Sequence, residues 1–559
     1  MCIARMIMKT AVLLLLVQCT WSHPENPVVN TPLGSIKGTT LTSRLGKTIY
    51  SFLGIKYAKP PVDELRFKPP VPIEKYEGTY DATKDGPICP QPVVKPIISE
   101  DCLLLNVYST KLPEGKENPK RPVIVFILPG GFYSAGATSY VAGPQYLMDK
   151  DIVLVTFNYR LGSLGFMATG DKEAPGNNGM KDQVLVLKWV QKNIESFGGD
   201  PNSVTLLGYS SGSFSTILHM LSPMSKGLFH KAIAMSGSPL GIYPIPHEQV
   251  HLAKHQAKLL GCPEETPEKI LQCLKTKPAK ELGDSLLRFR EFGLDPILIW
   301  SPVVEPDFGQ ERFLTDDPIH LIKKGQILTN VPLIIGQTSD EFASNAFTVV
   351  KNETLTKAMN EHWEEIAPIA FIYERGTDHS IKVSKAIRKF YLDDKPVDKS
   401  QVENLAKIYT DALESFPINR AAKLLAHHSK EPIYYYRFSF TGRYSHFYLP
   451  DTNNTVPHGA AHHDDLMYLF HIGFAFPQFT AETYPAEDKM VNKLTTLYTN
   501  FAKTSNPTPT TDPELDNVKW EKFDLKDQKF LDIGDKMVIS EKMFDDRMKF
   551  WETLYPLDK

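Results

Sequence analysis

A serine at the centre of a glycine-flanked pentapeptide is the residue of this chain best suited to nucleophilic chemistry. The segment Gly208-Tyr209-Ser210-Ser211-Gly212 has the pattern G-x-S-x-G, and it joins a predicted strand, residues 203–207, to a predicted helix, residues 214–220. A strand-to-helix turn this tight strains its central residue and admits only small residues beside it, so the glycines fit and the Ser210 hydroxyl would be exposed. The pattern predicts a serine nucleophile; the alternative is a serine-rich turn that caps a helix.

This nucleophile would need two partners elsewhere in the chain. A serine hydroxyl reacts poorly until a base takes its proton, and the base needs an acid that orients it. Where a strand-turn-helix carries the serine, the chain order is serine, then aspartate or glutamate, then histidine. The chain contains 16 histidines, so Ser210 by itself does not identify the base.

Short runs of apolar and β-branched residues predict the strands that would position such a site. Several are apolar on successive residues, as expected of central strands covered on both faces. A helical pattern spans 182–197, and a second helix is expected to start near Ser540, because Phe544, Met548, Trp551 and Tyr555 would share one face. Strands alternating with helices predict a mainly parallel α/β sheet with ligand sites at the carboxyl ends of its strands. The predicted strands are 122–128, 152–158, 204–207, 232–235 and 331–335.

The composition is that of a soluble globular protein. The 559 residues include 62 basic and 65 acidic side chains, with a formal net charge of −3, and 42% are hydrophobic. This balance excludes a disordered chain and a polycation that binds nucleic acid. Neither a repeat nor a linker interrupts the sequence, which favours a single domain over residues 23–559.

The first residues predict export. Arg5 and Lys9 precede an apolar run, residues 11–17, and small residues follow it, as in a secretory signal peptide covering residues 1–22. The run is too short to span a membrane, which takes about 20 residues; the alternative is a buried N-terminal strand. The final residues, WETLYPLDK, contain no apolar tail for a lipid anchor. We therefore expect a secreted, extracellular protein without a membrane anchor.

The cysteines and two glycosylation motifs agree with secretion. Without residues 1–22, four cysteines remain in two sequence-local pairs, Cys89 with Cys102 and Cys262 with Cys273. Disulfides are expected in an oxidising compartment. Because each would close only a short loop, they should fix the local structure of that loop and contribute modestly to the stability of the fold. Asn352 and Asn453 begin N-x-T motifs and are candidate glycosylation sites.

Many ordered strings of residues resemble the type-B carboxylesterase and cholinesterase family over nearly the whole mature chain. The resemblance implies the α/β-hydrolase fold, with a mostly parallel central sheet and helices on both faces, and the chain looks most like insect secreted carboxylesterases. It also implies that the two cysteine pairs match family disulfides and that Arg66 with Glu100, and Arg160 with Asp182, form buried ion pairs. The strings include Gly54-Ile55-Lys56-Tyr57-Ala58, Ser99-Glu100-Asp101-Cys102-Leu103, Asn158-Tyr159-Arg160, Gly176-Asn177-Asn178-Gly179 and Phe197-Gly198-Gly199-Asp200-Pro201-Asn202.

The resemblance also identifies the partners of Ser210. The acid falls on Glu341, at the end of the string Gly336-Gln337-Thr338-Ser339-Asp340-Glu341, and the base falls on His462, in Gly459-Ala460-Ala461-His462. The order Ser210, Glu341, His462 is the expected one. Ser236 matches a family serine that supports the acid. The alternatives are that Glu341 is a solvated loop carboxylate and His462 a surface histidine.

The loop expected to stabilise an oxyanion departs from the family pattern. Relatives usually carry His or Tyr followed by three glycines, whereas this chain has Leu128-Pro129-Gly130-Gly131. Pro129 has no N–H group, so it is expected to affect the geometry of this loop and, through it, the rate of catalysis. The family's donors map to the N–H groups of Gly130, Gly131 and Ser211, all of which are retained.

These features together imply a serine carboxylic-ester hydrolase, a carboxylesterase that acts through an acyl-enzyme on small to medium apolar esters, with no metal and no other cofactor. The loop from Cys89 to Cys102 lacks the tryptophan with which cholinesterases bind quaternary ammonium, so acetylcholine is not expected as a substrate. Tyr209 stands where cholinesterases have Glu and juvenile hormone esterases have Gln, which argues against both specialised activities. The alternative is a ligand carrier or an adhesion-type binding module of the same fold. The oligomeric state is left open.

Overall fold

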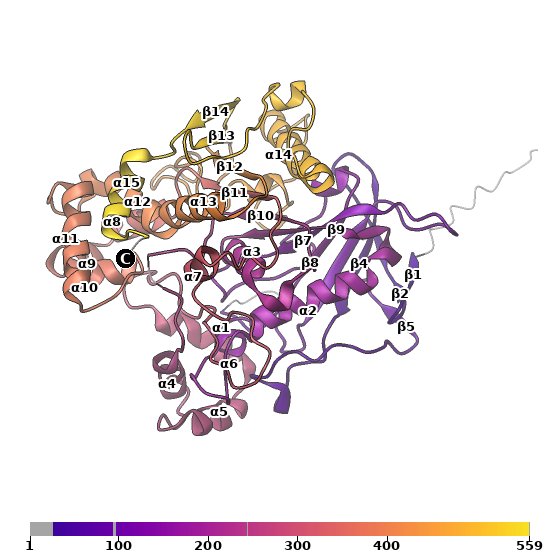
Figure 1. Cartoon of the computed structure of the whole chain (residues 1–559), viewed down its shortest axis with the longest axis horizontal. Coiled ribbons are helices and arrows are strands. Elements are labelled where there is room, and N and C mark those ends of the chain that lie inside the picture. Colours follow the sequence, from indigo (N-terminus) through magenta and orange to yellow (C-terminus); the bar gives the residue numbers. More distant parts are fainter. Residues whose placement is uncertain (1–25, 93–96, 243, 558–559) are drawn as a thin grey trace, which may run out of the picture.

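In the described part of the chain, a mixed sheet of 11 strands forms the centre of the protein (Figure 1). The computed structural model describes residues 26–92, 97–242 and 244–557, so the predicted signal peptide lies outside the described residues. The strands from β8 to β13 are parallel, and antiparallel strands flank them at both edges. In sheet order they are β14 (Met537–Glu541), β13 (Lys529–Ile533), β12 (Ile433–Phe438), β11 (Leu333–Thr338), β10 (Lys231–Met235), β9 (Gly199–Tyr209), β7 (Arg121–Ile127), β8 (Val153–Phe157), β6 (Leu104–Ser109), β4 (Thr48–Lys56) and β3 (Thr39–Thr42).

The central strands are buried on both faces, as their successive apolar residues predict. Every residue of β8, β10 and β11 is buried. The five predicted strands are all present, although β9 begins at Gly199, earlier than expected. A second, small sheet contains β1 (Val28–Thr31), β2 (Gly34–Lys37) and β5 (Thr79–Asp81).

Helices cover both faces of the sheet, and strand β7 shows how its side chains divide between them. Val123 and Val125 pack into one core with apolar residues of α2 (Asn178–Asn193), α3 (Ser211–Leu221) and α13 (Phe416–His428). Ile124 and Phe126 point the other way and pack with α14 (Pro485–Thr504). This alternation follows from the two-residue period of a strand, and it confirms the predicted α/β-hydrolase architecture.

A cluster of helices lies at one end of the sheet, at the left of Figure 1, away from β1, β2 and β5. It has its own apolar core, which includes Trp363, Tyr409 and Trp551. Its members are α8 (Ala343–Lys351), α9 (Glu353–Glu361), α10 (Trp363–Ala370), α11 (Asp378–Leu392), α12 (Val402–Thr410) and α15 (Asp545–Leu554). The remaining α-helices of the described residues are α1 (Gly162–Phe166), α4 (Val250–Leu259), α5 (Pro267–Lys275), α6 (Ala279–Asp284) and α7 (Pro318–Lys323).

The predicted start of the C-terminal helix is wrong. Ser540 belongs to β14, where it pairs with Phe530 of β13, and the helix begins at Asp545. Met548 and Trp551 are buried as the helical spacing predicts. The apolar periodicity located the helix face, but the strand before it depends on pairing with β13, which a local pattern does not reveal.

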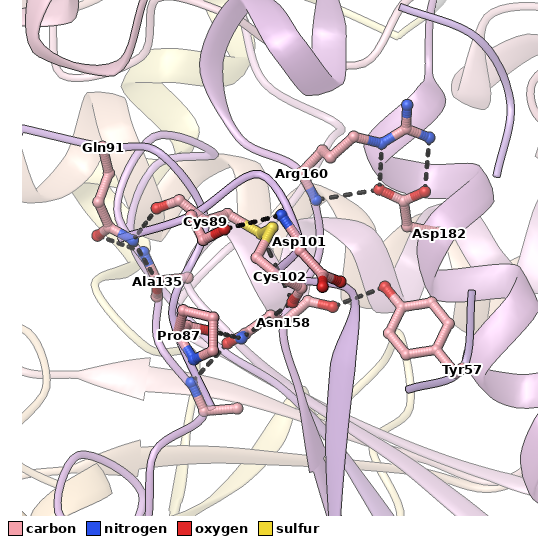
Figure 2. The surroundings of a disulfide bond; sticks show 12 residues. Tyr57, Pro87, Cys89, Gln91, Asp101, Cys102, Ala135, Asn158, Arg160 and Asp182 are labelled. Carbon is pink, nitrogen blue, oxygen red and sulfur yellow. Dashed lines mark hydrogen bonds and ion pairs between the residues drawn. A yellow bond between two sulfur atoms is a disulfide. The ribbon is translucent and has the colours of Figure 1, made fainter. Parts of the chain in front are cut away.

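Both expected disulfides and both expected ion pairs are present. Cys89 is bonded to Cys102 and Cys262 to Cys273. Figure 2 shows the buried Arg160–Asp182 pair near the first disulfide, with two guanidinium-to-carboxylate contacts of 2.8 and 2.6 Å. The Arg66 Nε atom donates to Glu100 at 2.8 Å. Among the described residues, no helix combines the length and the apolar character that crossing a membrane requires.

Candidate active site

The serine predicted as nucleophile occupies a sharp turn between β9 and α3. Ser210 has φ 55° and ψ −120°, a strained conformation for a residue with a side chain, and its N–H donates to the Met235 carbonyl at 2.8 Å. A Cβ atom added to Gly208 would lie 2.0 Å from the Gly212 carbonyl oxygen, and one added to Gly212 would lie 2.1 Å from the Ile127 carbonyl oxygen. Close backbone packing therefore requires glycine on both sides, and Ser210 has the geometry of a nucleophile elbow.

The predicted acid and base are hydrogen-bonded to each other. His462 Nδ1 pairs with the carboxylate Oε2 of Glu341. Glu341 is fully buried, and its Oε1 accepts from the Thr338 N–H at 2.8 Å. The Asp340 N–H donates to the Ala460 carbonyl at 3.0 Å and so joins the two loops that carry the pair. This burial excludes the alternative in which Glu341 is a solvated carboxylate. When the proton of the Glu341–His462 hydrogen bond lies at Nδ1, the Nε2 atom of His462 is free to accept a proton from another group.

Ser210 and His462 line the same cavity, which has a volume of about 510 Å³. Within the described part of the chain, no hydrogen bond joins the Ser210 hydroxyl to His462. In ligand-free enzymes such bonds are often long and tighten only when substrate binds. The structure thus brings Ser210 to the same cavity as His462, which is hydrogen-bonded to Glu341.

The predicted oxyanion donors border this cavity as well. Gly130, Gly131 and Ser211 all line it, and the two glycines have φ angles of 124° and 58°. A Cβ atom on Gly130 would lie 1.4 Å from the Ser134 carbonyl oxygen, so this position excludes any larger residue. Ser211 is the first residue of α3, and its N–H has no acceptor within the helix. The arrangement can place several N–H groups around an anionic oxygen.

Leu128 and Pro129, the two residues that depart from the family pattern, do not line the cavity. Leu128 is 2% exposed and packs in the core with Phe126 and Leu207. The Leu128 side chain therefore contributes to the core, and Pro129 affects the site through the backbone path into Gly130.

A glutamine that sequence reasoning missed connects the first disulfide to the oxyanion loop (Figure 2). The Gln91 amide nitrogen donates to the carbonyls of Cys89, at 3.0 Å, and Ala135, at 2.6 Å. Its Oε1 accepts from the Ala135 N–H and the Ser134 hydroxyl, both at 3.1 Å. Because the Ser134 N–H bonds to the Gly130 carbonyl, Gln91 holds the segment that closes the Gly130 turn. No motif marks Gln91 in the sequence.

Tyr209 makes a second set of contacts that the sequence did not reveal, with His462 and His463. Its hydroxyl accepts the N–H of His463 at 2.7 Å, and its ring centroid lies 5.3 Å from that of His462. Tyr209 is fully buried, and its burial, followed by the charges of Asp465 and Glu341, raises its pKa well above the ordinary value. It therefore remains a neutral phenol that fixes the backbone next to His462.

We expect Tyr209→Phe to lower kcat about tenfold with little change in KM. The substitution leaves the His463 N–H without its acceptor, an effect on the order of 1–3 kcal/mol, and loosens the loop that orients His462. Steady-state hydrolysis of 4-nitrophenyl butyrate checks this. Tyr434→Phe is the matched control, since Tyr434 is 3% exposed but its hydroxyl makes no hydrogen bond among the described residues. Equal kcat values for both variants would rule out this role of Tyr209.

Three further predicted residues have defined surroundings. The Ser236 hydroxyl is buried without a hydrogen-bond partner among the described residues, so its support of Glu341 stays a prediction. Its backbone N–H donates to the Gly336 carbonyl at 2.8 Å, on the strand that leads to Glu341. Asn352 and Asn453 are both exposed, and Asn352 caps α9 through its side-chain oxygen. Both asparagines are thus accessible to glycosylation.

The chain is similar to known esterases over most of its length. The family model described as "Carboxylesterase family" matches residues 25–551. The juvenile hormone esterase of Tribolium castaneum is 34% identical over 560 residues, which cover 94% of each protein. Esterase FE4 of Myzus persicae is 37% identical over 500 residues, covering 87% of this chain and 86% of that protein. The crystal structure of juvenile hormone esterase from Manduca sexta, with OTFP covalently attached, has a TM-score of 0.83 and 32% identity, over 95% of this chain and all of that one.

Proposed function

Because the chain belongs to the carboxylesterase family and is a carboxylic ester hydrolase, we propose that it acts as a secreted serine esterase through an acyl-enzyme intermediate. Ser210 is the nucleophile, His462 the general base and Glu341 the acid that orients it. The observation that carries this proposal is the buried hydrogen bond between Glu341 and His462, on a cavity that Ser210 also lines.

The reaction proceeds in two halves. His462 takes the Ser210 proton as the serine oxygen attacks the ester carbonyl, while Glu341 stabilises the imidazolium that forms. The N–H groups of Gly130, Gly131 and Ser211 bind the developing oxyanion. The ester C–O bond then breaks, and the alcohol leaves with the proton from His462. Water repeats these steps on the acyl-enzyme and releases the carboxylic acid.

The cavity supports small to medium apolar esters as substrates. Its volume of about 510 Å³ falls in the range typical of small-molecule sites. Burying an apolar acyl or alcohol chain there is favourable because it removes that surface from water. The apolar side chains in its wall include Phe132, Phe214, Ile242, Leu298, Phe342 and Phe447.

We further propose that residues 1–22 are a signal peptide and that residues 23–559 form one catalytic domain. The two disulfides support an oxidising compartment, and Asn352 and Asn453 carry glycans. The proposed mechanism uses no metal or organic cofactor, because the three side chains and the backbone amides supply each step.

An acid-quench experiment with 4-nitrophenyl acetate tests the acyl-enzyme. We expect one acetyl group per protein on the peptide that contains Ser210, measured by mass spectrometry, together with continued release of 4-nitrophenolate in the steady state. The adduct should be absent from Ser210→Ala. Stoichiometric release without further turnover on a panel of esters would instead support the ligand-carrier alternative.

A further inference from the structure

A buried carboxyl group without a partner lies in the wall of the active-site cavity. Glu414 lines the cavity that holds Ser210 and His462, and it is 6% exposed. Its Oε2 is fully buried and has no hydrogen bond among the described residues. Its neighbours in the cavity wall, Leu413 and Pro417, are apolar. Buried polar groups are almost always hydrogen-bonded, so this exception calls for a functional explanation.

The segment that carries Glu414 is anchored to the segment that carries the proposed catalytic acid. Residues 411–415 form one π-helical turn between α12 and α13, and such turns occur frequently at functional sites. On one side of the turn, the Thr410 hydroxyl donates to the Glu341 carbonyl at 2.6 Å. On the other side, the Ser415 hydroxyl accepts from the Gln337 amide at 2.6 Å. Glu414 is therefore held at a fixed place relative to Glu341.

The surroundings of Glu414 favour its neutral form. Burial, and after it the nearby charge of Glu341, raises the pKa of the Glu414 carboxyl well above its ordinary value. A neutral carboxyl group has an O–H that can donate a hydrogen bond, which a carboxylate lacks. The other charged or titratable residues that line the cavity are Tyr133, Arg290, His446, His462 and His463.

We propose that Glu414 is a specificity-determining residue whose carboxyl donates a hydrogen bond to a substrate oxygen outside the scissile ester group. The preferred substrates are then apolar esters that carry one further acceptor, such as a ketone or ether oxygen, in the acyl or alcohol chain. This inference rests on the proposed function, because it assumes that the ester group lies at Ser210. A substrate acceptor would complete the hydrogen bonding that the protein leaves open at Glu414.

Matched ester pairs test this proposal. The probes are 4-nitrophenyl hexanoate, its analogues with a keto oxygen at C4 or C5, and hexanoate esters of alkyl and alkoxyalkyl alcohols, each corrected for its rate of hydroxide hydrolysis. In the wild type, at least one oxygen-bearing ester should have the higher kcat/KM. Glu414→Leu should reduce that preference roughly tenfold, and Glu414→Gln, which keeps a donor, should retain most of it. Glu361→Leu, an exposed site on α9, is the matched control and should keep the wild-type ratio.

The pH dependence separates hydrogen-bond donation from a structural role. The wild-type preference should fall as the pH rises to the point where Glu414 ionises, because the carboxylate has no proton to donate. The preference of Glu414→Gln should not change in this way. Equal ratios in the wild type and Glu414→Leu for every ester pair would overturn the proposal, as would a wild-type ratio that stays parallel to that of the Gln variant through the ionisation of Glu414. Ser210→Ala distinguishes the two hypotheses. Full activity of this variant would contradict the proposed function. If it is inactive but the wild type and Glu414→Leu have equal ratios, only the role of Glu414 is contradicted.

Discussion

Ser210→Ala is expected to lower kcat about a million-fold for every ester that the wild type hydrolyses, and to abolish labelling by organophosphates. The serine oxygen forms the covalent bond to the acyl group, and an alanine at the strained turn between β9 and α3 has no atom that can form it. The cavity and the N–H groups of Gly130 and Gly131 remain, so substrate binding should change little. Hydrolysis of 4-nitrophenyl butyrate, together with mass spectrometry of protein treated with a fluorophosphonate, measures both effects.

Ser203→Ala is the matched control for this experiment. Ser203 belongs to β9, the strand that leads into the Ser210 turn, but it is not among the residues that line the cavity. Its substitution should leave both turnover and labelling close to the wild-type values. Labelling that persists in Ser210→Ala would show that another residue is the nucleophile.

Glu341→Gln is expected to lower kcat about ten-thousand-fold with little change in KM. The buried carboxylate accepts the hydrogen bond from His462 Nδ1 and so keeps Nε2 free to take the serine proton. An amide can donate to Nδ1 instead, which favours the tautomer that cannot act as a base. Thr338 still supplies its N–H to the side-chain oxygen, so the loop should keep its position. Single-turnover acylation with 4-nitrophenyl acetate isolates the affected step.

Asp340→Asn provides the comparison for the Glu341 variant. Asp340 lies next to Glu341 in the same loop but is not among the residues that line the cavity. Its backbone bond to Ala460, which joins the two loops, does not depend on its side chain. We expect kcat to stay within about threefold of the wild type, since asparagine keeps an oxygen that can accept from the Ser339 hydroxyl, as the half-buried Asp340 side chain does. A Glu341→Gln enzyme that also stays in this range would exclude Glu341 as the orienting acid.

A local sequence pattern predicts those strands whose burial constrains every residue. The strands β8, β10 and β11 are predictable because burial on both faces demands apolar residues in succession. Strand β12, with the sequence IYYYRF, is not among the predicted strands, although its first four residues are buried and it lies between β11 and β13. The predicted start of the C-terminal helix is too early, because β14 exists only through its pairing with β13.

The amino-acid sequence by itself determined the nucleophile elbow. Glycine is required at positions 208 and 212 because a side chain there would clash with backbone a few residues from Ser210 or with one adjacent strand. The sequence by itself did not determine Glu341 or His462, which were identified through resemblance to a family. Only the tertiary structure decided which atoms meet: Gln91 with Ala135, Tyr209 with His463, and Glu414 with the cavity. These contacts join residues far apart in the chain, and their distances depend on how the strands and helices pack, a property that no local spacing encodes.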